Sequence, residues 1–270
     1  MEISELKNRA LSFDRAMELK PIYWGDERRE LKGFKAIWNI DRQITAAVVS
    51  NRYNLLQHRD FIAAACNAIQ NLNIPADARV RDDGNRIYVD ISFKSTVLYA
   101  GENEEFLAGI RLINSYNATT GVMILPYFLR VICSNGMVVK SFAKGYNIRH
   151  TAKIVQDFEG AIQGILNDLI ASNEKLKALV NECIADSVEW DTMIRVLNNV
   201  MKTRKHADAI NDILLKKTGW VFTRWDLYNA FTQYATHGKQ LTPYVESLIQ
   251  TKAEKILTTP LMALLPKKRE

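Results

Sequence analysis

The sequence lacks the short motifs that mark many well-defined enzyme sites. It contains no GxxxxGKS/T or GxGxxG loop for cradling phosphates, no GxSxG nucleophile and no HExxH zinc pair. These absences give no support to nucleotide hydrolysis, serine-nucleophile chemistry or zinc proteolysis. We therefore predict no catalytic residue, no cofactor and no metal site, and the balance favours a protein that binds over one that catalyses.

Cysteine is scarce as well. The three cysteines, Cys66, Cys133 and Cys183, are widely separated, and none forms a CxxC or CxxH pair. This spacing argues against a disulfide framework and against a structural zinc site. We expect all three to be small buried apolar side chains.

Long hydrophobic runs are also missing. The longest, such as Ala46 to Val49 and Val122 to Leu125, are far shorter than the ~20 residues that a membrane helix needs. The first twenty residues carry acids at Glu2 and Glu5 and have no apolar centre, so they do not predict a signal peptide. We expect a cytoplasmic protein with no membrane partner.

The composition itself is that of a globular protein. The chain has 270 residues, of which 47% are hydrophobic and 24% charged, enough for one large domain or two ordinary ones. The formal net charge is +6, and the only dense basic tract is Lys267 to Arg269. Such a mild excess is compatible with a polyanionic partner but does not require one.

The pattern of the first 150 residues predicts β structure with one packed helix. An amphipathic helix is expected over residues 1–20 and a loop over 21–33. Pro126 lies inside a strand-like run and cannot donate a ladder hydrogen bond, which predicts a bulge or an edge, and Asn135-Gly136 predicts a tight turn. Further predicted elements are hairpins at 34–50 and 79–93 (turning at 83–85), a helix at 60–72, and strands at 107–114 and 122–133.

From about residue 151 the apolar period becomes helical. We predict a long helix from 151 with a break at Ser172-Asn173, then helices at about 189–200, 206–216, 222–236 and 243–257. An aromatic series is expected to be largely a core stripe, namely Trp220, Phe222, Trp225, Tyr228, Phe231 and Tyr234. The predicted class is α+β: an antiparallel or mixed β-sheet with a packed helix over residues 1–150, and a helical half over 151–270 that either packs with the first as one unit or stands apart.

Five stretches together resemble a known family. They are VVSNRYNLLQ (48–57), IRLINSYNATTG (110–121), LRVICSNGM (129–137), IRHT (148–151) and RWDLYNAFTQYATH (224–237). The family is phage- and plasmid-associated and known only as a domain of unknown function. Its motifs read S-x-R-Y, N-S-H-D-G-S, R-V-V-C-x-N-T-L, R-H-T and W-x-x-x-N-A-x-T-E-Y-x-D-H, in the same order from about residue 45 to 240.

The chain also departs from these motifs. Tyr116 and Asn117 stand where the family usually has His-Asp, and Gly136 stands where it has Thr. If the His-Asp pair served as a metal or acid–base element in relatives, this chain lacks both groups. The resemblance implies a role in DNA replication, recombination or host interaction of a mobile element, without deciding among them.

The clearest functional signal is a cluster of basic residues in segment 140–153. Segment 140–153 has no acid and interleaves cations with aromatic rings, which suits phosphates and unpaired bases. A helix beginning near Thr151 would add backbone N–H groups for a phosphate. The predicted nucleic-acid contacts are Lys140, Lys144, Tyr146, Arg149, His150 and Lys153 in this segment, and Arg204, Lys205, Lys216 and Arg224 in the helical half.

Three functions are ranked from these observations. The first is a mobile-element protein that binds or anneals single-stranded DNA without catalysis, with homo-oligomerisation left open. The second is a protein-interaction factor with a host or phage partner. The third is a metal-dependent nuclease; it ranks last because the acids of Asp82-Asp83 and of Glu102 to Glu105 read as solvated turns, and because His150 and His237 read as capping or buried hydrogen-bonding groups.

Overall fold

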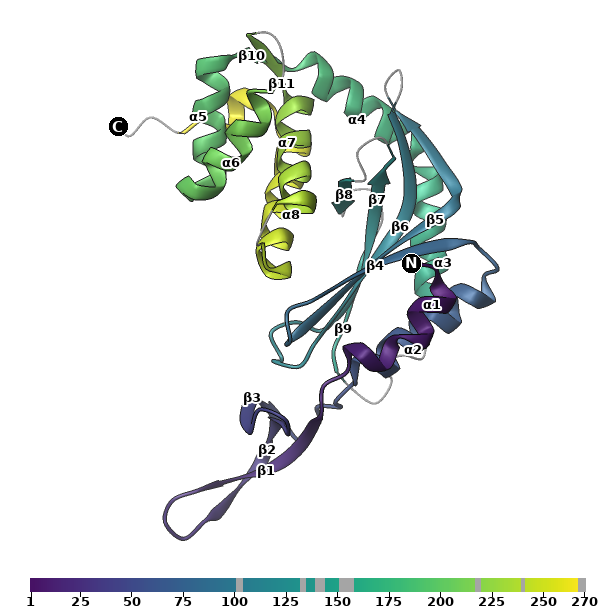
Figure 1. Cartoon of the computed structure of the whole chain (residues 1–270), viewed down its shortest axis with the longest axis vertical. Helices are drawn as coiled ribbons and strands as arrows, with labels where there is room; N and C mark the ends of the chain where they lie inside the picture. The colour runs from purple at the N-terminus through teal and green to yellow at the C-terminus, as the bar shows by residue number, and fades with distance from the viewer. Residues whose placement is uncertain are drawn as a thin grey trace. The chain divides into compact units, whose positions relative to one another are not determined.

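The structure, a computed structural model, describes residues 1–100, 104–131, 135–138, 144–150, 158–216, 220–238 and 241–266 (Figure 1). Contacts divide the chain into two compact units. The first comprises Met1–Ser95, Gly109–Pro126 and Ala143–Asp168, and the second Thr96–Ala108, Tyr127–Phe142 and Leu169–Glu270. The units interleave along the chain, whereas the sequence pattern placed one boundary near residue 150. The predicted α+β class is confirmed, with antiparallel sheets first and helices in the C-terminal half.

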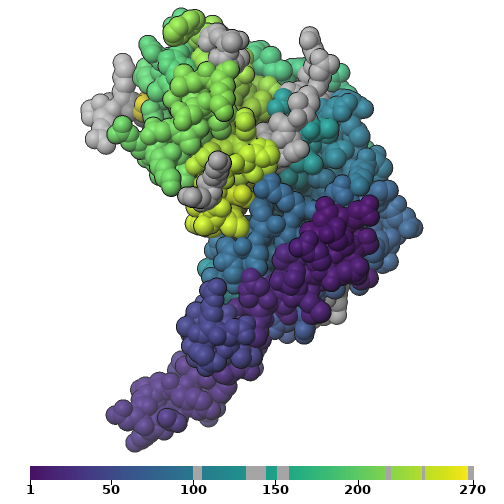
Figure 2. Space-filling model, viewed as in Figure 1, coloured from purple at the N-terminus to yellow at the C-terminus, as the bar shows by residue number. Residues whose placement is uncertain are grey.

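The first unit begins with two short helical turns and a three-stranded antiparallel sheet. The elements are α1 (Ile3–Asn8), η1 (Ala10–Phe13), β1 (Met17–Trp24), β2 (Arg29–Asn39) and β3 (Ile44–Ser50), with the sheet in the order β1-β2-β3. The helix predicted over 1–20 is therefore too long, and the loop predicted over 21–33 is wrong. Residues 17–39 form a hairpin, which is purple in Figure 2. Pro21 is tolerated because β1 is an edge strand whose register shifts there, and Gly25 turns with a φ of 71°.

A six-stranded sheet follows helix α2 (His58–Asn71). Its strands are β4 (Ala76–Asp82), β5 (Arg86–Ala100), β6 (Glu104–Ser115), β7 (Val122–Arg130), β8 (Asn135–Val138) and β9 (Tyr146–Ile148), in the order β4-β5-β6-β7-β8 with β9 also on β7. The hairpin predicted at 83–85 is confirmed: Gly84 has a φ of 86°, and Asp83 Oδ1 accepts from the N–H groups of Asn85 and Arg86. Helix α3 (Phe158–Ala171) meets α2 through the rings of Phe61 and Phe158.

Strand β7 changes its pairing partner at the proline. Residues 122–124 pair with β9 and residues 127–130 pair with β8, so Pro126 lies between the two described registers. Pro126 has no N–H to donate to a ladder, and the described pairing with β8 and β9 does not include it. The turn predicted at Asn135-Gly136 is wrong, since Asn135 pairs with Arg130 and Gly136 with Leu129 inside β8.

The second unit contains the predicted helices. These are α4 (Asn173–Ala185), α5 (Trp190–Met201), α6 (Arg204–Leu214), α7 (Arg224–His237) and α8 (Pro243–Thr258), followed by η2 (Leu261–Leu264). Sequence reasoning missed the small antiparallel pair β10 (Ser187–Glu189) and β11 (Val221–Thr223). Thr223 caps α7 in a reciprocal capping box with Asp226, and this fixes where the helix begins.

The core contains most of the predicted aromatic series. Five of its six members are buried, which confirms that the series is largely core, and Trp220 is 80% exposed. Cys66 and Cys183 are buried as predicted, whereas Cys133 lies outside the described residues. None of the helices in the described part of the chain is long and apolar enough to cross a membrane.

Candidate functional site

A cavity of about 460 Å³ lies within the first unit. It collects residues from three segments that are far apart in sequence: the end of β3, the turn before β7 and the end of β9. The lining residues are Val49, Ser50, Arg52, Tyr53, Ala118, Thr120, Gly121, Arg149 and His150. We call this cavity the arginine pocket.

Backbone contacts hold the three segments together. The N–H of Asn54 donates to the carbonyl oxygen of His150 at 2.9 Å, and this bond joins the β3 end to the β9 end. Gly121 lies so close to β9 that a Cβ there would come within 2.5 Å of Asn147 Oδ1 and 2.6 Å of the Ile148 carbonyl oxygen. A larger residue at 121 would therefore push the turn away from β9 and open the pocket.

The inner wall contains polar atoms without partners. The His150 side chain is only 5% exposed, and its ring is stacked on that of Tyr53. Within the described chain, neither ring nitrogen of His150 has a hydrogen-bond partner, nor does the hydroxyl of Tyr53 or of Thr120. Buried polar groups are normally satisfied, so this concentration in one cavity indicates a place for a polar ligand.

The charge of the pocket comes from two exposed arginines. Arg52 and Arg149 both line it, and none of its described lining residues is acidic. Burial lowers the pKa of His150, and burial also raises the pKa of Tyr53 to about 12. At neutral pH the imidazole and the phenol are therefore uncharged hydrogen-bonding groups beside two guanidinium cations, an arrangement suited to an oxyanion.

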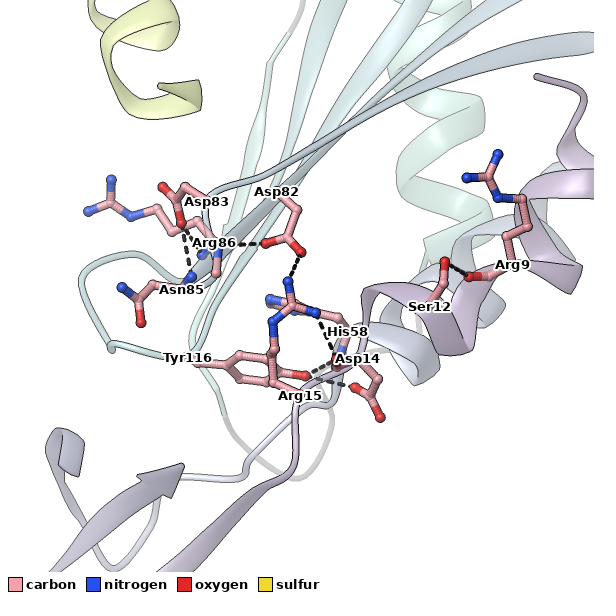
Figure 3. A network of polar contacts seen from close by, with 11 residues as sticks. Arg9, Ser12, Asp14, Arg15, His58, Asp82, Asp83, Asn85, Arg86 and Tyr116 are labelled. Carbon is pink, nitrogen blue, oxygen red and sulfur yellow. Dashed lines mark hydrogen bonds and ion pairs between the residues drawn. The ribbon is translucent and has the colours of Figure 1, made fainter. Parts of the chain in front are cut away.

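Tyr116 organises the polar network near this pocket (Figure 3). Its ring is stacked on that of His58 at a centroid distance of 3.8 Å. Its hydroxyl accepts from the backbone N–H of His58 at 2.7 Å and faces acceptors on Asp14 at 2.9 Å and Gln57 at 3.0 Å. Tyr116 thus joins η1, α2 and the end of β6. Tyr116, which stands where the motif of the sequence resemblance has histidine, is buried and hydrogen-bonded within the fold.

The same network fixes the turn between β4 and β5. The Arg15 guanidinium donates to Asp82 Oδ2 and, at 2.8 Å, to the Asp14 carbonyl oxygen. Asp82 was interpreted as part of a solvated turn, yet it is paired with Arg15 across the unit. Its carboxylate is therefore engaged in holding the fold.

The basic segment 140–153 is only partly described. Lys144 and Tyr146 are exposed on and beside β9, Arg149 is exposed at the arginine pocket, and His150 is buried in it. The predictions for Lys140 and Lys153 lie outside the described residues. The structure therefore connects two of the predicted residues, Arg149 and His150, to a cavity.

The second predicted cluster belongs to the helical unit. Arg204 and Lys205 are exposed in the first turn of α6, and Lys216 is exposed just after it. Arg224 is 1% exposed, and its guanidinium donates to Glu182 Oε1 at 2.6 Å and lies 3.4 Å from Asp186 Oδ2. Arg224 is therefore a buried, ion-paired residue that stabilises the fold of the second unit. His237, at the end of α7, is exposed.

Sequence reasoning missed Arg52, Tyr53 and Thr120 as site residues. Arg52 is a single cation between two β segments, so charge density could not single it out. The S-x-R-Y stretch was the available signal, since Ser50, Arg52 and Tyr53 all line the pocket together with the Arg149-His150 pair of the R-H-T stretch. Among the described residues, no group of three histidine, cysteine or acidic side chains is placed to hold a metal ion.

The fold and pocket define an α+β protein with a cationic cavity on its first unit. Residues 46–260 match a family described as Domain of unknown function (DUF932). The chain belongs to this family, and every residue that lines the arginine pocket falls within the matched range. No match was found among curated proteins or among solved structures.

Proposed function

We propose that this protein binds single-stranded DNA without catalysis and holds a backbone phosphate in the arginine pocket. One observation carries the proposal: two guanidinium groups from distant segments line one cavity with four unpartnered polar atoms and no described carboxylate. A phosphate supplies oxygen acceptors for both arginine guanidinium groups, which are exposed at the cavity.

Neighbouring side chains favour a polymer over a small anion. Lys144 and Tyr146 are exposed immediately before Arg149, on and beside β9. A cation and an aromatic ring at this spacing would contact the next phosphate and its base. The cavity volume of about 460 Å³ falls within the ~300–1,000 Å³ typical of ligand sites, so it has room for a phosphate with part of its sugar.

We propose further phosphate contacts on the second unit, at Arg204, Lys205 and Lys216. These exposed cations would add to the salt-dependent part of the affinity without reading sequence. A mobile-element setting belongs to the same proposal and rests on the family resemblance. A homo-oligomer that anneals strands is proposed with it, and a cytoplasmic location is proposed from the short apolar runs and the N-terminal pattern of the sequence.

Two other functions remain as competing proposals. An interaction factor is favoured by Trp220 and Val221, which are 80% and 56% exposed in the second unit. A metal-dependent nuclease has less support at this site, because a divalent cation prefers carboxylate oxygens and the described pocket lining offers none.

The test is fluorescence anisotropy with a labelled oligothymidine and with a duplex of equal length over a salt series. We expect tight binding of the single strand that weakens with salt, with a log–log slope of about −0.7 for each phosphate neutralised. Equal failure to bind either DNA would overturn the proposal. A stable protein complex recovered in place of DNA binding would favour the interaction factor.

A further inference from the structure

A second hollow, of about 310 Å³, lies on the sheet formed by β1, β2 and β3. Its side walls come from all three strands, and the hairpin that carries part of it is seen in purple in Figure 2. The residues that line it include Lys20, Tyr23, Ala36, Trp38, Thr45 and Val48. We call it the tryptophan hollow.

Strand register explains which face of the sheet is open. Lys20, Ala36 and Val48 are aligned side by side across the three strands. The neighbouring row, Leu19, Ile37 and Ala47, points the other way and packs into a core that includes Tyr116. Since side chains alternate along a strand, the row with Lys20 lies on the opposite face of the sheet, where Val48 is 57% exposed and Ala36 is buried.

Trp38 gives the hollow its chemistry. The ammonium of Lys20 lies 4.9 Å from the centre of the indole ring and is also paired with Glu18 at 2.6 Å. The indole Nε1 is buried and has no hydrogen-bond partner within the described chain. The floor is thus an aromatic surface beside a lysine ammonium, and none of the residues that line the hollow is acidic.

A nucleobase fits these requirements better than an aliphatic group does. It has a flat π face for the aromatic rings and carries oxygen or nitrogen acceptors for Lys20. An aliphatic side chain of a partner protein has neither a π face nor an acceptor for the ammonium.

Strand β3 connects the hollow to the arginine pocket. Val48 lines the tryptophan hollow, whereas the next two residues, Val49 and Ser50, line the arginine pocket. Each strand residue advances only ~3.3 Å, and β3 ends the described order of its sheet, so one DNA strand could pass over this edge. We infer that the tryptophan hollow binds a base of the strand whose phosphate occupies the arginine pocket; this inference rests on the proposed function.

The experiment compares oligothymidine with an abasic oligomer of the same length, which has the same backbone charge but no bases. Intrinsic tryptophan fluorescence is followed in the full chain and in Trp38→Phe. We expect oligothymidine to quench the wild type, the quench to be lost in Trp38→Phe, and the abasic oligomer to quench neither. Trp24→Phe is the matched control, because Trp24 is 61% exposed on β1 but does not line the hollow.

Affinity gives the second readout. Trp38→Ala should weaken oligothymidine binding by about fivefold or more and leave abasic binding unchanged, while Trp38→Phe, which keeps a stacking ring, should bind oligothymidine within about twofold of the wild type. Equal affinity for both oligomers, with the quench intact in Trp38→Phe, would overturn the inference and leave the proposed function standing. Failure to bind either oligomer would overturn both.

Discussion

The phenol ring of Tyr53 lies against the imidazole ring of His150, with centroids 4.7 Å apart and planes 10° from parallel. One residue follows β3 and the other follows β9, so the stack joins two segments that are distant in sequence. The same two residues supply three of the unpartnered polar atoms in the arginine pocket. The stack of Tyr53 on His150 therefore joins two distant segments and also places unpaired polar atoms beside the arginine pocket.

Removing both pocket arginines should weaken DNA binding strongly. In Arg52→Gln/Arg149→Gln the phosphate would lose two charge-assisted contacts, each of ~1.5–3 kcal/mol, so the affinity should fall by roughly a hundredfold or more. The slope of log affinity against log salt should also become shallower by about 0.7, for the one phosphate that the pocket holds. Anisotropy titrations over a salt series measure both quantities.

The control for this variant is Arg9→Gln, which removes a positive charge from the exposed arginine that follows α1, pairs with Glu5 and lines neither cavity. If binding depends on net charge alone, Arg9→Gln and Arg149→Gln should weaken it equally. A pocket that holds phosphate predicts a clear loss for Arg149→Gln and a change of less than about twofold for Arg9→Gln.

Local patterns predicted the helical unit well because its signals are local. Apolar spacing located α5 to α8 within a few residues, and Asp83-Gly84 identified a turn that requires positive φ. The hairpin of β1 and β2 was missed because Pro21 and a charge run resemble a loop, and three-residue strands such as β10 are too short for a period. The sequence predicted only part of the pocket. Arg149 lies in a basic segment that charge density identifies, whereas Arg52 reaches the pocket only through the fold.

Acidification should destabilise the first unit through His58. Burial, followed by the charge of Arg15 and then that of His150, lowers the pKa of His58 to about 3. The unfolded chain takes up this proton below about pH 6.5, so the free energy of unfolding should fall between about pH 6.5 and pH 3, by up to ~1.4 kcal/mol per pH unit. Urea unfolding across this range should show a shallower dependence for His58→Gln than for the wild type; parallel curves would contradict the assignment.

Tyr116→Phe should lower stability although it removes a single oxygen atom. The phenylalanine ring can still stack on His58, but the buried backbone N–H of His58 loses its acceptor, the Tyr116 hydroxyl at 2.7 Å. Leaving such a donor unsatisfied costs ~1–3 kcal/mol. Chemical denaturation measures the change, and Tyr99→Phe, at a site 58% exposed, should alter stability by less than about 0.5 kcal/mol.

Asp90→Asn should be the most destabilising of these changes. Asp90, on β5, is buried between Arg81 of β4 and Arg111 of β6, and its Oδ2 accepts from their guanidinium groups at 2.8 and 2.7 Å. Burial alone would raise the pKa of Asp90, but Arg111 and Arg81 outweigh it and hold the pKa below its ordinary value. An asparagine would leave two buried cations facing a neutral amide, at a cost of ~3–5 kcal/mol.

The stability lost in Asp90→Asn should depend on pH, and this dependence tests the role of the carboxylate charge. A carboxylate whose pKa is lowered on folding contributes stability above its unfolded pKa of about 3.9 and loses that contribution as the pH falls through the folded value. The gap between wild type and Asp90→Asn should therefore be widest at pH 7 and should narrow only below about pH 4. Asp77→Asn breaks an exposed pair with Lys94 on the same sheet and should cost no more than ~1 kcal/mol. A gap for Asp90→Asn no larger than this would show that its two arginines are satisfied without the carboxylate.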